Sequence, residues 1–303
     1  MNYEEKCIID LHIHSNNSDG AKSTEELLEE FDKLNMDIVS FTDHNNVKCY
    51  YDLANSKVKL KKEIIIIPGV ELCFAYNGEV RHMLGYGIKT DIISKFIEKC
   101  SIEQKKEEKV ILKNFKENCK KLNLKFDKEI QIKRGYKYEA YTLMWKSLNA
   151  YPENLIKYPI IENNSKFYWE HVNNKNSPFF IDSSTNIPNM KEIVELIHKA
   201  KGLAFLSHPF IYNRSKEDGI KFIAEAIKNK VDGIELKHYS HTDDETEFLK
   251  NIARENNLYT SGGSDHHDDY PSSSKLIIGN NNMLVKYDDI KDWLNIIDFI
   301  KYS

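Results

Sequence analysis

The sequence has few cysteines, and they form no recognisable motif. Only five of the 303 residues are cysteine, an odd number, and none belongs to a Cys-x-x-Cys pair. This argues against a secreted disulfide framework and against a cysteine-based zinc finger. The amino terminus lacks a basic region followed by an apolar one, and no apolar run is long enough to span a bilayer. We therefore expect a soluble cytoplasmic protein without membrane contact.

The sequence also lacks an excess of positive charge. It has 43 Lys and Arg against 47 Asp and Glu, a formal net charge of −4. We therefore do not expect a generally basic surface that binds long nucleic acid duplexes, although a local basic patch remains compatible with this balance. With 41% hydrophobic residues, the chain is long enough for one barrel-sized domain or two smaller ones.

What the sequence does contain is a pair of histidines on a predicted strand. An apolar segment, Cys7 to Ile9, leads into Asp10-Leu11-His12-Ile13-His14. Because side chains alternate along a strand, His12 and His14 face the same side. Two neutral imidazoles in this arrangement suit a metal ion, although a His-x-His pair also occurs on strands by chance.

Short apolar strands and amphipathic helices alternate over much of the chain. After the first strand, further strands are predicted at 37–41, 64–67, 82–88, 203–206, 231–236 and 258–261. Helices are predicted at 23–34, where Ser23 and Glu26 form a capping box, and at 190–200, 218–230 and 243–256. Seven strands separated mostly by helices indicate a parallel α/β sheet or barrel.

Residues 93–189 interrupt this alternation. Residues 93–125 have the pattern of a charged helix, and the segment from Asp127 to Pro188 is aromatic and Asn-rich without clear alternation. We predict that 93–189 is a mainly helical insertion or cap. The barrel domain would then comprise 1–92 and 190–303.

His, Asp and Glu residues recur where the predicted strands end. They are His12 and His14, His44, Glu71, His208, and Asp265 with His267; His82 instead begins its strand. The carboxyl ends of parallel strands share one rim of a barrel, which is where such folds place their active sites.

Six ordered motifs resemble the PHP (polymerase and histidinol phosphatase) family of trinuclear metal-dependent phosphoesterases. They are Asp10-Leu11-His12-Ile13-His14, Thr42-Asp43-His44, Pro68-Gly69-Val70-Glu71, His82-Met83-Leu84-Gly85, Ser207-His208-Pro209 and Gly263-Ser264-Asp265-His266-His267. The resemblance covers about residues 7–92 and 190–270. It implies a distorted (β/α)7 TIM-like barrel and three divalent metal ions.

The resemblance also implies which residues hold each ion. His12, His14, Glu71 and Asp265 would hold the first; Glu71, His82 and His208 the second; Asp19, His44 and His267 the third. Imidazole and carboxylate ligands fit Mn, Fe or Zn. Two ions that share a carboxylate can generate a metal-bound hydroxide for in-line attack at phosphorus, and a third can neutralise developing charge.

Other residues have weaker indications. His241 resembles a family residue that could protonate a leaving oxygen, with less support for His238. Arg214 could clamp a phosphate or be a solvated surface arginine. Asp10 and Asp43 could orient imidazoles or be ordinary loop carboxylates.

The insertion contains a local excess of positive charge. From Lys99 to Lys137 there are 13 Lys or Arg against 6 Asp or Glu, an excess of 7. This can be the solvated face of a helix, or a basic lid in which Arg134 and nearby tyrosines (Tyr136, Tyr138 and Tyr141) bind phosphates and stack on bases. Related enzymes commonly carry a Gly-Arg-Pro-His-like segment here, whereas this chain has Lys133-Arg134-Gly135-Tyr136-Lys137.

The sequence thus predicts a hydrolase of phosphate mono- or diesters in nucleotides or short oligonucleotides, acting without a covalent enzyme intermediate. Two alternatives remain open. One is a small-metabolite phosphatase of the histidinol-phosphate type. The other is a non-catalytic module stabilised by its metals. No motif indicates a protein partner.

Overall fold

The computed structural model describes residues 7–131, 139–157, 164–181, 187–211, 215–267, 278–279 and 285–303. The chain divides into two compact units. Unit 1 comprises Met1–Tyr76, Arg81–Lys95 and Pro188–Ser303, and unit 2 comprises Asn77–Val80 and Phe96–Ile187. That residues 93–189 act as a cap stays a prediction.

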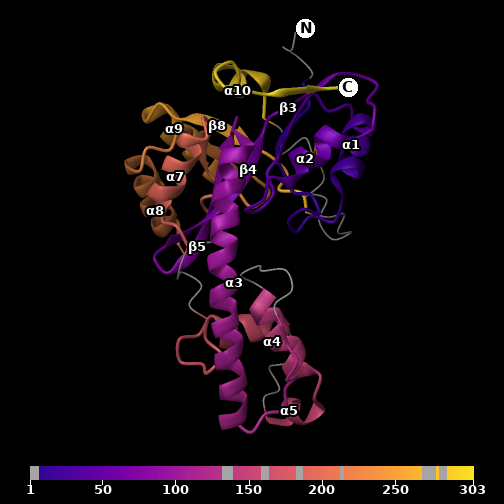
Figure 1. The fold of residues 1–303 in the computed structure, drawn as a ribbon. Coiled ribbons are helices and arrows are strands. Elements are labelled where there is room, and N and C mark those ends of the chain that lie inside the picture. The colour runs from indigo at the N-terminus through magenta and orange to yellow at the C-terminus, as the bar shows by residue number, and fades with distance from the viewer. Residues whose placement is uncertain are drawn as a thin grey trace. The chain divides into compact units, whose positions relative to one another are not determined.

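The first sheet of unit 1 has the strand order β1-β2-β3-β9. Its strands are β1 (Ile9–Ile13), β2 (Ile38–Phe41), β3 (Ile64–Ile66) and β9 (Ile300–Tyr302) (Figure 1). The first three are parallel, and β9 pairs antiparallel with β3. All residues of β1, β2 and β3 are buried, as expected for apolar runs covered on both faces.

The second sheet has the order β4-β5-β6-β7-β8. Its strands are β4 (Gly69–Tyr76), β5 (Glu79–Tyr86), β6 (Leu203–Leu206), β7 (Gly233–Lys237) and β8 (Tyr259–Gly262). Asn77 and Gly78 join β4 to β5 with φ of +51° and +78°, the left-handed conformations of a tight hairpin turn. β6, β7 and β8 run parallel, whereas β5 is antiparallel to β6.

Two isolated bridges connect the sheets. Ile13 at the end of β1 pairs with His266, and His44 after β2 pairs with Glu71 in β4. The predicted α/β class is confirmed. The described strands number nine instead of the expected seven, β3–β9 and β5–β6 are among the antiparallel pairs, and the strands hydrogen-bond as two sheets. A closed barrel stays a prediction.

In unit 1, helices alternate with most of the strands along the chain. They are α1 (Thr24–Lys33), α2 (Lys48–Asn55), α7 (Met190–Lys199), α8 (Lys216–Lys228), α9 (Asp243–Glu255) and α10 (Tyr287–Leu294). The predicted capping box of α1 is confirmed: the Glu26 amide donates to Ser23 Oγ at 3.2 Å, and Glu26 accepts from the Ser23 amide at 2.7 Å. Helix α10 and strand β9 have no counterpart among the sequence predictions.

Helix α10 closes one end of the core of unit 1. The fully buried Trp293 ring stacks on Tyr86 and packs against Phe205, and its Nε1 donates to the Thr260 carbonyl at 3.0 Å. A buried indole with a satisfied N–H contributes a large apolar area without a desolvation penalty. This packing supports strands whose other ends carry the site.

Apart from the first residues of β5, the regular elements described in unit 2 are helices. Helix α3 (Thr90–Lys121) supplies its first turns to unit 1 and the rest to unit 2, which also contains α4 (Glu139–Asn149), α5 (Pro152–Lys157), α6 (Asn164–Phe167) and the π-helical turn η2 (Tyr168–Val172). These helices bury their own core around Phe115, Met144 and Phe167. Among the described helices, none has both the length and the apolar character required to cross a bilayer.

Candidate metal centre

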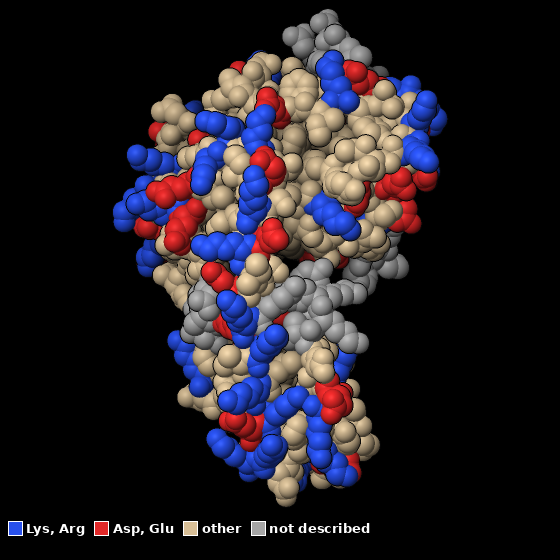
Figure 2. Space-filling model, in the orientation of Figure 1, with Lys and Arg blue, Asp and Glu red and all other residues tan. Residues whose placement is uncertain are grey.

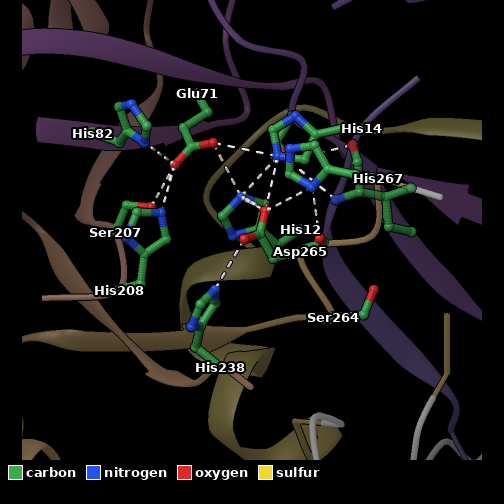
Figure 3. Close-up of polar contacts among 12 residues, drawn as sticks. His12, His14, Glu71, His82, Ser207, His208, His238, Ser264, Asp265 and His267 are labelled. Atoms are coloured by element: carbon green, nitrogen blue, oxygen red, sulfur yellow. Dashed lines mark hydrogen bonds and ion pairs between the residues drawn. The ribbon is translucent and has the colours of Figure 1, made fainter. Parts of the chain in front are cut away.

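The end of β1 brings two imidazoles together. His12 and His14 are fully buried, and their Nε2 atoms lie 3.1 Å apart, as the alternation of strand side chains predicts. In Figure 3 both rings lie beside Glu71 and Asp265. The backbone of His14 is held by a hydrogen bond to the His266 carbonyl at 2.9 Å, which ties β1 to the segment after β8.

Glu71 lies at the centre of the site. Its carboxylate is fully buried, and nitrogen atoms of five imidazoles lie 2.9–3.3 Å from its two oxygens: His12, His14, His44, His82 and His208. Glu71 was predicted to mark the end of the 64–67 strand, but it lies inside a separate strand, β4, that begins at Gly69. His82 was expected to begin a strand but lies inside β5, the neighbour of β4.

The loop after β8 supplies the opposite wall. Asp265 Oδ1 lies 3.2 Å from His12 Nε2 and 3.1 Å from His14 Nε2. Two residues further on, His267 Nε2 lies 3.3 Å from Asp19 Oδ1. The loop after β1 therefore does fold back so that Asp19 faces the histidines.

Two residues of the site have left-handed backbones. His208 has φ of +22° and Asp265 has φ of +53°. Such conformations cost non-glycine residues about 1–3 kcal/mol and persist where surrounding contacts impose them. Here the His208 amide donates to Glu235 Oε2 at 2.7 Å, and the Ser264 amide donates to Asp10 Oδ1 at 3.0 Å. Strain held in this way is typical of functional sites.

The charged groups shift one another's pKa strongly. Burial alone would raise the pKa of Glu71, but His44, His12 and His82 hold it well below its usual value. Burial would lower the pKa of His12, but Glu235, Asp265 and Glu71 raise it well above its usual value. Burial lowers the pKa of His44 to about 3. The centre is therefore a buried set of carboxylates that attracts either protons or a cation.

The geometry of His12 fits a metal cation. His12 Nδ1 lies 2.8 Å from Glu235 Oε1, so a neutral ring that donates there turns the Nε2 lone pair toward the oxygens of Glu71 and Asp265. Lone pairs facing one another repel unless a cation lies between them. His14 Nδ1 is likewise buried without a hydrogen-bond partner and faces Asp19 at 3.7 Å.

The ligand atoms form compact groups in which all members lie within 4.8 Å of one another. Three groups are His12, His14, Glu71 and Asp265; Glu71, His82 and His208; and His14, Asp19, His44 and His267. They match the sets that the family resemblance implies, with His14 added to the third. Two further groups are His44, Cys73 and His82, and His208, His238 and Asp265.

Sequence patterns missed one residue at the centre, Glu235, and gave His238 less support than His241. Glu235 in β7 is fully buried and contacts both His12 and the His208 amide. His238 Nε2 lies 3.1 Å from Asp265 Oδ2. A carboxylate inside the apolar run Ile234-Glu235-Leu236 was an available signal, since buried charges need partners. A carboxylate behind a ligand imidazole orients the ring and raises its basicity.

Asp10 and Asp43 support loops instead of imidazoles. Asp43 accepts from the Ser15 amide and hydroxyl and from Ser18 Oγ, each at 2.7 Å. Asp10 accepts from the backbone amides of His12, Ser264 and Gly279. Of the two readings left open by the sequence, the loop carboxylate fits these contacts.

The remaining predicted residues stand apart. His241 Nδ1 donates to the Leu236 carbonyl at 2.9 Å, and burial lowers its pKa to about 4. A neutral imidazole is a poor proton donor, so a catalytic role for His241 stays a prediction without geometric support. Arg134 and Arg214 lie outside the described residues. Tyr141 is packed against Tyr168 at 5.1 Å within unit 2.

Comparison with known proteins gives a family match over most of the chain. The PHP domain model matches residues 10–238. A 5'-3' exoribonuclease of Haemophilus influenzae is 24% identical over 267 residues, covering 84% of this chain and 88% of the relative. Both matches therefore extend beyond the barrel motifs into the predicted insertion at 93–189.

Solved structures share the fold. An amidohydrolase of Chromobacterium violaceum with bound sulfate and no metal is 18% identical with a TM-score of 0.65, covering 94% of this chain and 96% of that one. A chain of Bifidobacterium adolescentis to which metal-dependent phosphoesterase activity is attributed is 20% identical with a TM-score of 0.61, covering 97% and 98%.

Proposed function

Since the chain belongs to the PHP domain family and is a hydrolase of phosphate esters, we propose that it cleaves phosphate mono- or diesters of nucleotides or short oligonucleotides. The match to the 5'-3' exoribonuclease of Haemophilus influenzae covers 84% of this chain. It supports the proposal that the substrate is a nucleic acid. We also propose that the metal-binding unit forms a distorted (β/α)7 barrel.

The observation that carries this proposal is the position of Glu71. One buried carboxylate contacts five imidazoles and belongs to two of the ligand groups. We assign three divalent ions to the nine residues His12, His14, Asp19, His44, Glu71, His82, His208, Asp265 and His267. Mixed imidazole and carboxylate ligands fit Mn, Fe or Zn.

The ions, when bound, supply Lewis-acid chemistry that lowers the pKa of water and neutralises charge developing at phosphorus. The protein supplies the positioning. Glu235 orients the His12 ring and also holds the His208 backbone. Asp43 fixes the Ser15–Ser18 turn from which Asp19 projects. Preorganisation of this kind reduces the motion that the ligands need during the reaction.

Unit 2 provides the features that favour a nucleotide. Figure 2 shows Lys and Arg side chains along α3. Lys109, Lys113 and Lys120 are exposed and share one face, since residues four and seven apart align on a helix. Trp169 in η2 is 64% exposed and offers a surface for base stacking. Exposed lysines and an exposed aromatic side chain within one unit are features that suit single-stranded nucleic acid.

The proposal is tested by hydrolysis of a defined panel. Metal-loaded protein is assayed with a nucleoside bisphosphate, short single-stranded RNA and DNA, and histidinol phosphate. We expect turnover of the nucleotide substrates. Turnover of histidinol phosphate alone would establish the small-metabolite phosphatase instead. The expectation against long duplexes has no support from the structure, so the panel includes a long duplex.

A variant separates catalysis from metal-stabilised binding. Asp265→Asn removes a charge from the first ligand group while keeping the shape of the side chain. We expect hydrolysis to collapse while circular dichroism remains that of the wild type. Unchanged hydrolysis would favour the non-catalytic module. Glu195→Gln on the exposed face of α7 is the matched control.

A further inference from the structure

The described part of the chain places one cysteine beside the candidate metal centre. Cys73 lies on β4 two residues after Glu71, so both side chains project from the same face of the strand. Its Sγ and nitrogen atoms of His44 and His82 all lie within 4.8 Å of one another. Of the five cysteines, all free, no other belongs to such a group among the described residues.

The backbone around Cys73 is fixed by the loop after β2. The Cys73 amide donates to Asn45 Oδ1 at 3.0 Å, and the Asn45 amide donates to the Glu71 carbonyl at 2.8 Å. Asn45 has φ of +44°, which turns its side chain back onto β4. The same loop carries His44, which bridges to Glu71. These bonds hold the backbones of Cys73 and His44 close to one another.

This group lies on the more accessible side of the centre. The side chains of His44 and His82 are 23% and 11% exposed, whereas those of His12, His14 and Glu71 are fully buried. Cys73 is half-buried. The rings of His44 and His82, which belong to different ligand groups, have centroids 4.6 Å apart. Cys73 therefore adjoins two of the proposed ion positions.

The chemistry of a thiol differs from that of the other donors. The nine proposed ligands are imidazoles and carboxylates, which serve Mn, Fe and Zn alike, whereas a thiolate is a soft ligand that favours zinc and disfavours manganese. We propose that Cys73 is a further metal ligand, acting with His44 and His82, and that it biases the centre toward zinc over manganese. This inference rests on the proposed function, because it needs the metal centre.

Cobalt substitution tests the sulfur ligand without an activity assay. Full-length protein loaded with Co(II) is examined for the near-ultraviolet charge-transfer band that a cobalt–thiolate bond produces. We expect the band in wild type and in Cys7→Ser, and its loss in Cys73→Ser. Cys7 is a suitable control because it is also half-buried, while burial and Asp37 raise its pKa to about 11.

Competition dialysis tests the metal preference of the same proteins. We expect Cys73→Ser to weaken zinc binding by ~10–100-fold, which is the loss of affinity typical when a residue that supports a metal site is replaced. The change in manganese binding should be smaller. Wild type that binds cobalt without the band, or a band that persists in Cys73→Ser, would overturn the assignment of Cys73 alone. Wild type in which elemental analysis finds no bound cobalt would overturn the metal centre and Cys73 together.

Discussion

The two units place their charges in opposite ways. Unit 1 contains 26 Lys or Arg against 34 Asp or Glu, a net charge of −8, and unit 2 contains 17 against 13, a net charge of +4. In unit 1, acidic groups such as Glu71, Asp265 and Glu235 are buried against imidazoles. In unit 2, Lys109, Lys113 and Lys120 of α3 are exposed to solvent. The buried negative charge of unit 1 is suited to holding cations, and the exposed positive charge of unit 2 is suited to attracting an anionic substrate.

The largest effect is expected from removing the central charge of unit 1. Glu71→Gln leaves five imidazoles without their shared anion, so metal content and hydrolysis should both fall. We expect a loss in kcat of at least ~10³-fold, the upper range for removing one electrostatic contact in an active site. Steady-state kinetics and elemental analysis measure the two losses. Retained metal content with normal turnover would contradict the central position of Glu71.

A second variant tests the support behind a ligand. Glu235→Gln keeps the size of the side chain but removes the anion beside His12 Nδ1 and the His208 amide. Loss of such a partner lowers metal affinity by ~10–100-fold. Isothermal titration with Mn or Zn measures this change. If affinity stays within experimental error of wild type, Glu235 serves the fold only.

Neutralising unit 2 should change binding without changing the metal centre. Replacing Lys109, Lys113 and Lys120 with Gln removes three charges from one face of α3. For an oligonucleotide substrate we expect KM to rise several-fold and its salt dependence to weaken, because fewer counterions are released on binding. Metal content and kcat should remain those of wild type. Unchanged KM and salt dependence would mean that this face is only solvated.

The smallest expected effect concerns a histidine outside the centre. His198 Nε2 lies 2.7 Å from Asp232 Oδ2, and this hydrogen bond raises the pKa of His198. Its stabilisation is therefore complete below the unfolded pKa of about 6.5 and is lost as pH rises through the higher folded value. Because the side chains are 38% and 25% exposed, the contribution should be below ~1 kcal/mol.

Urea unfolding of wild type and His198→Gln measures this contribution. The difference in free energy of unfolding should be larger near about pH 5.5 than near about pH 9. A difference that grows with rising pH would reverse the assigned direction. Metal content should be the same in both proteins, in contrast to the histidines beside Glu71.

Local patterns predicted much of the secondary structure. Ser23 and Glu26 identified the start of α1, and the run Ile64–Ile67 identified a buried strand. The Asn77-Gly78 pair, a strong hairpin signal, was overlooked, and residues 69–76 were therefore not predicted as a strand of their own. Helix α10 was missed because its stability depends on the distant contacts of Trp293 with Tyr86 and Phe205. Contacts of that kind leave no local pattern.

The site was predictable where a motif carried the chemistry. The residues around Glu71 were found because each stands in a short motif with a chemical reason for its composition. Glu235 and Cys73 lie beside imidazoles of the same site, but those imidazoles come from other strands and loops, which only the fold brings close to them. His238 and His241 are three residues apart in one loop, and the sequence could not decide which of them faces Asp265.

Anomalous X-ray diffraction from crystals soaked in manganese or zinc would show whether metal ions bind around Glu71. We expect three anomalous peaks: one among His12, His14, Glu71 and Asp265, one among Glu71, His82 and His208, and one among Asp19, His44 and His267. All should disappear or weaken in Glu71→Gln. A loaded crystal with no anomalous peak within bonding distance of Glu71 would contradict the account.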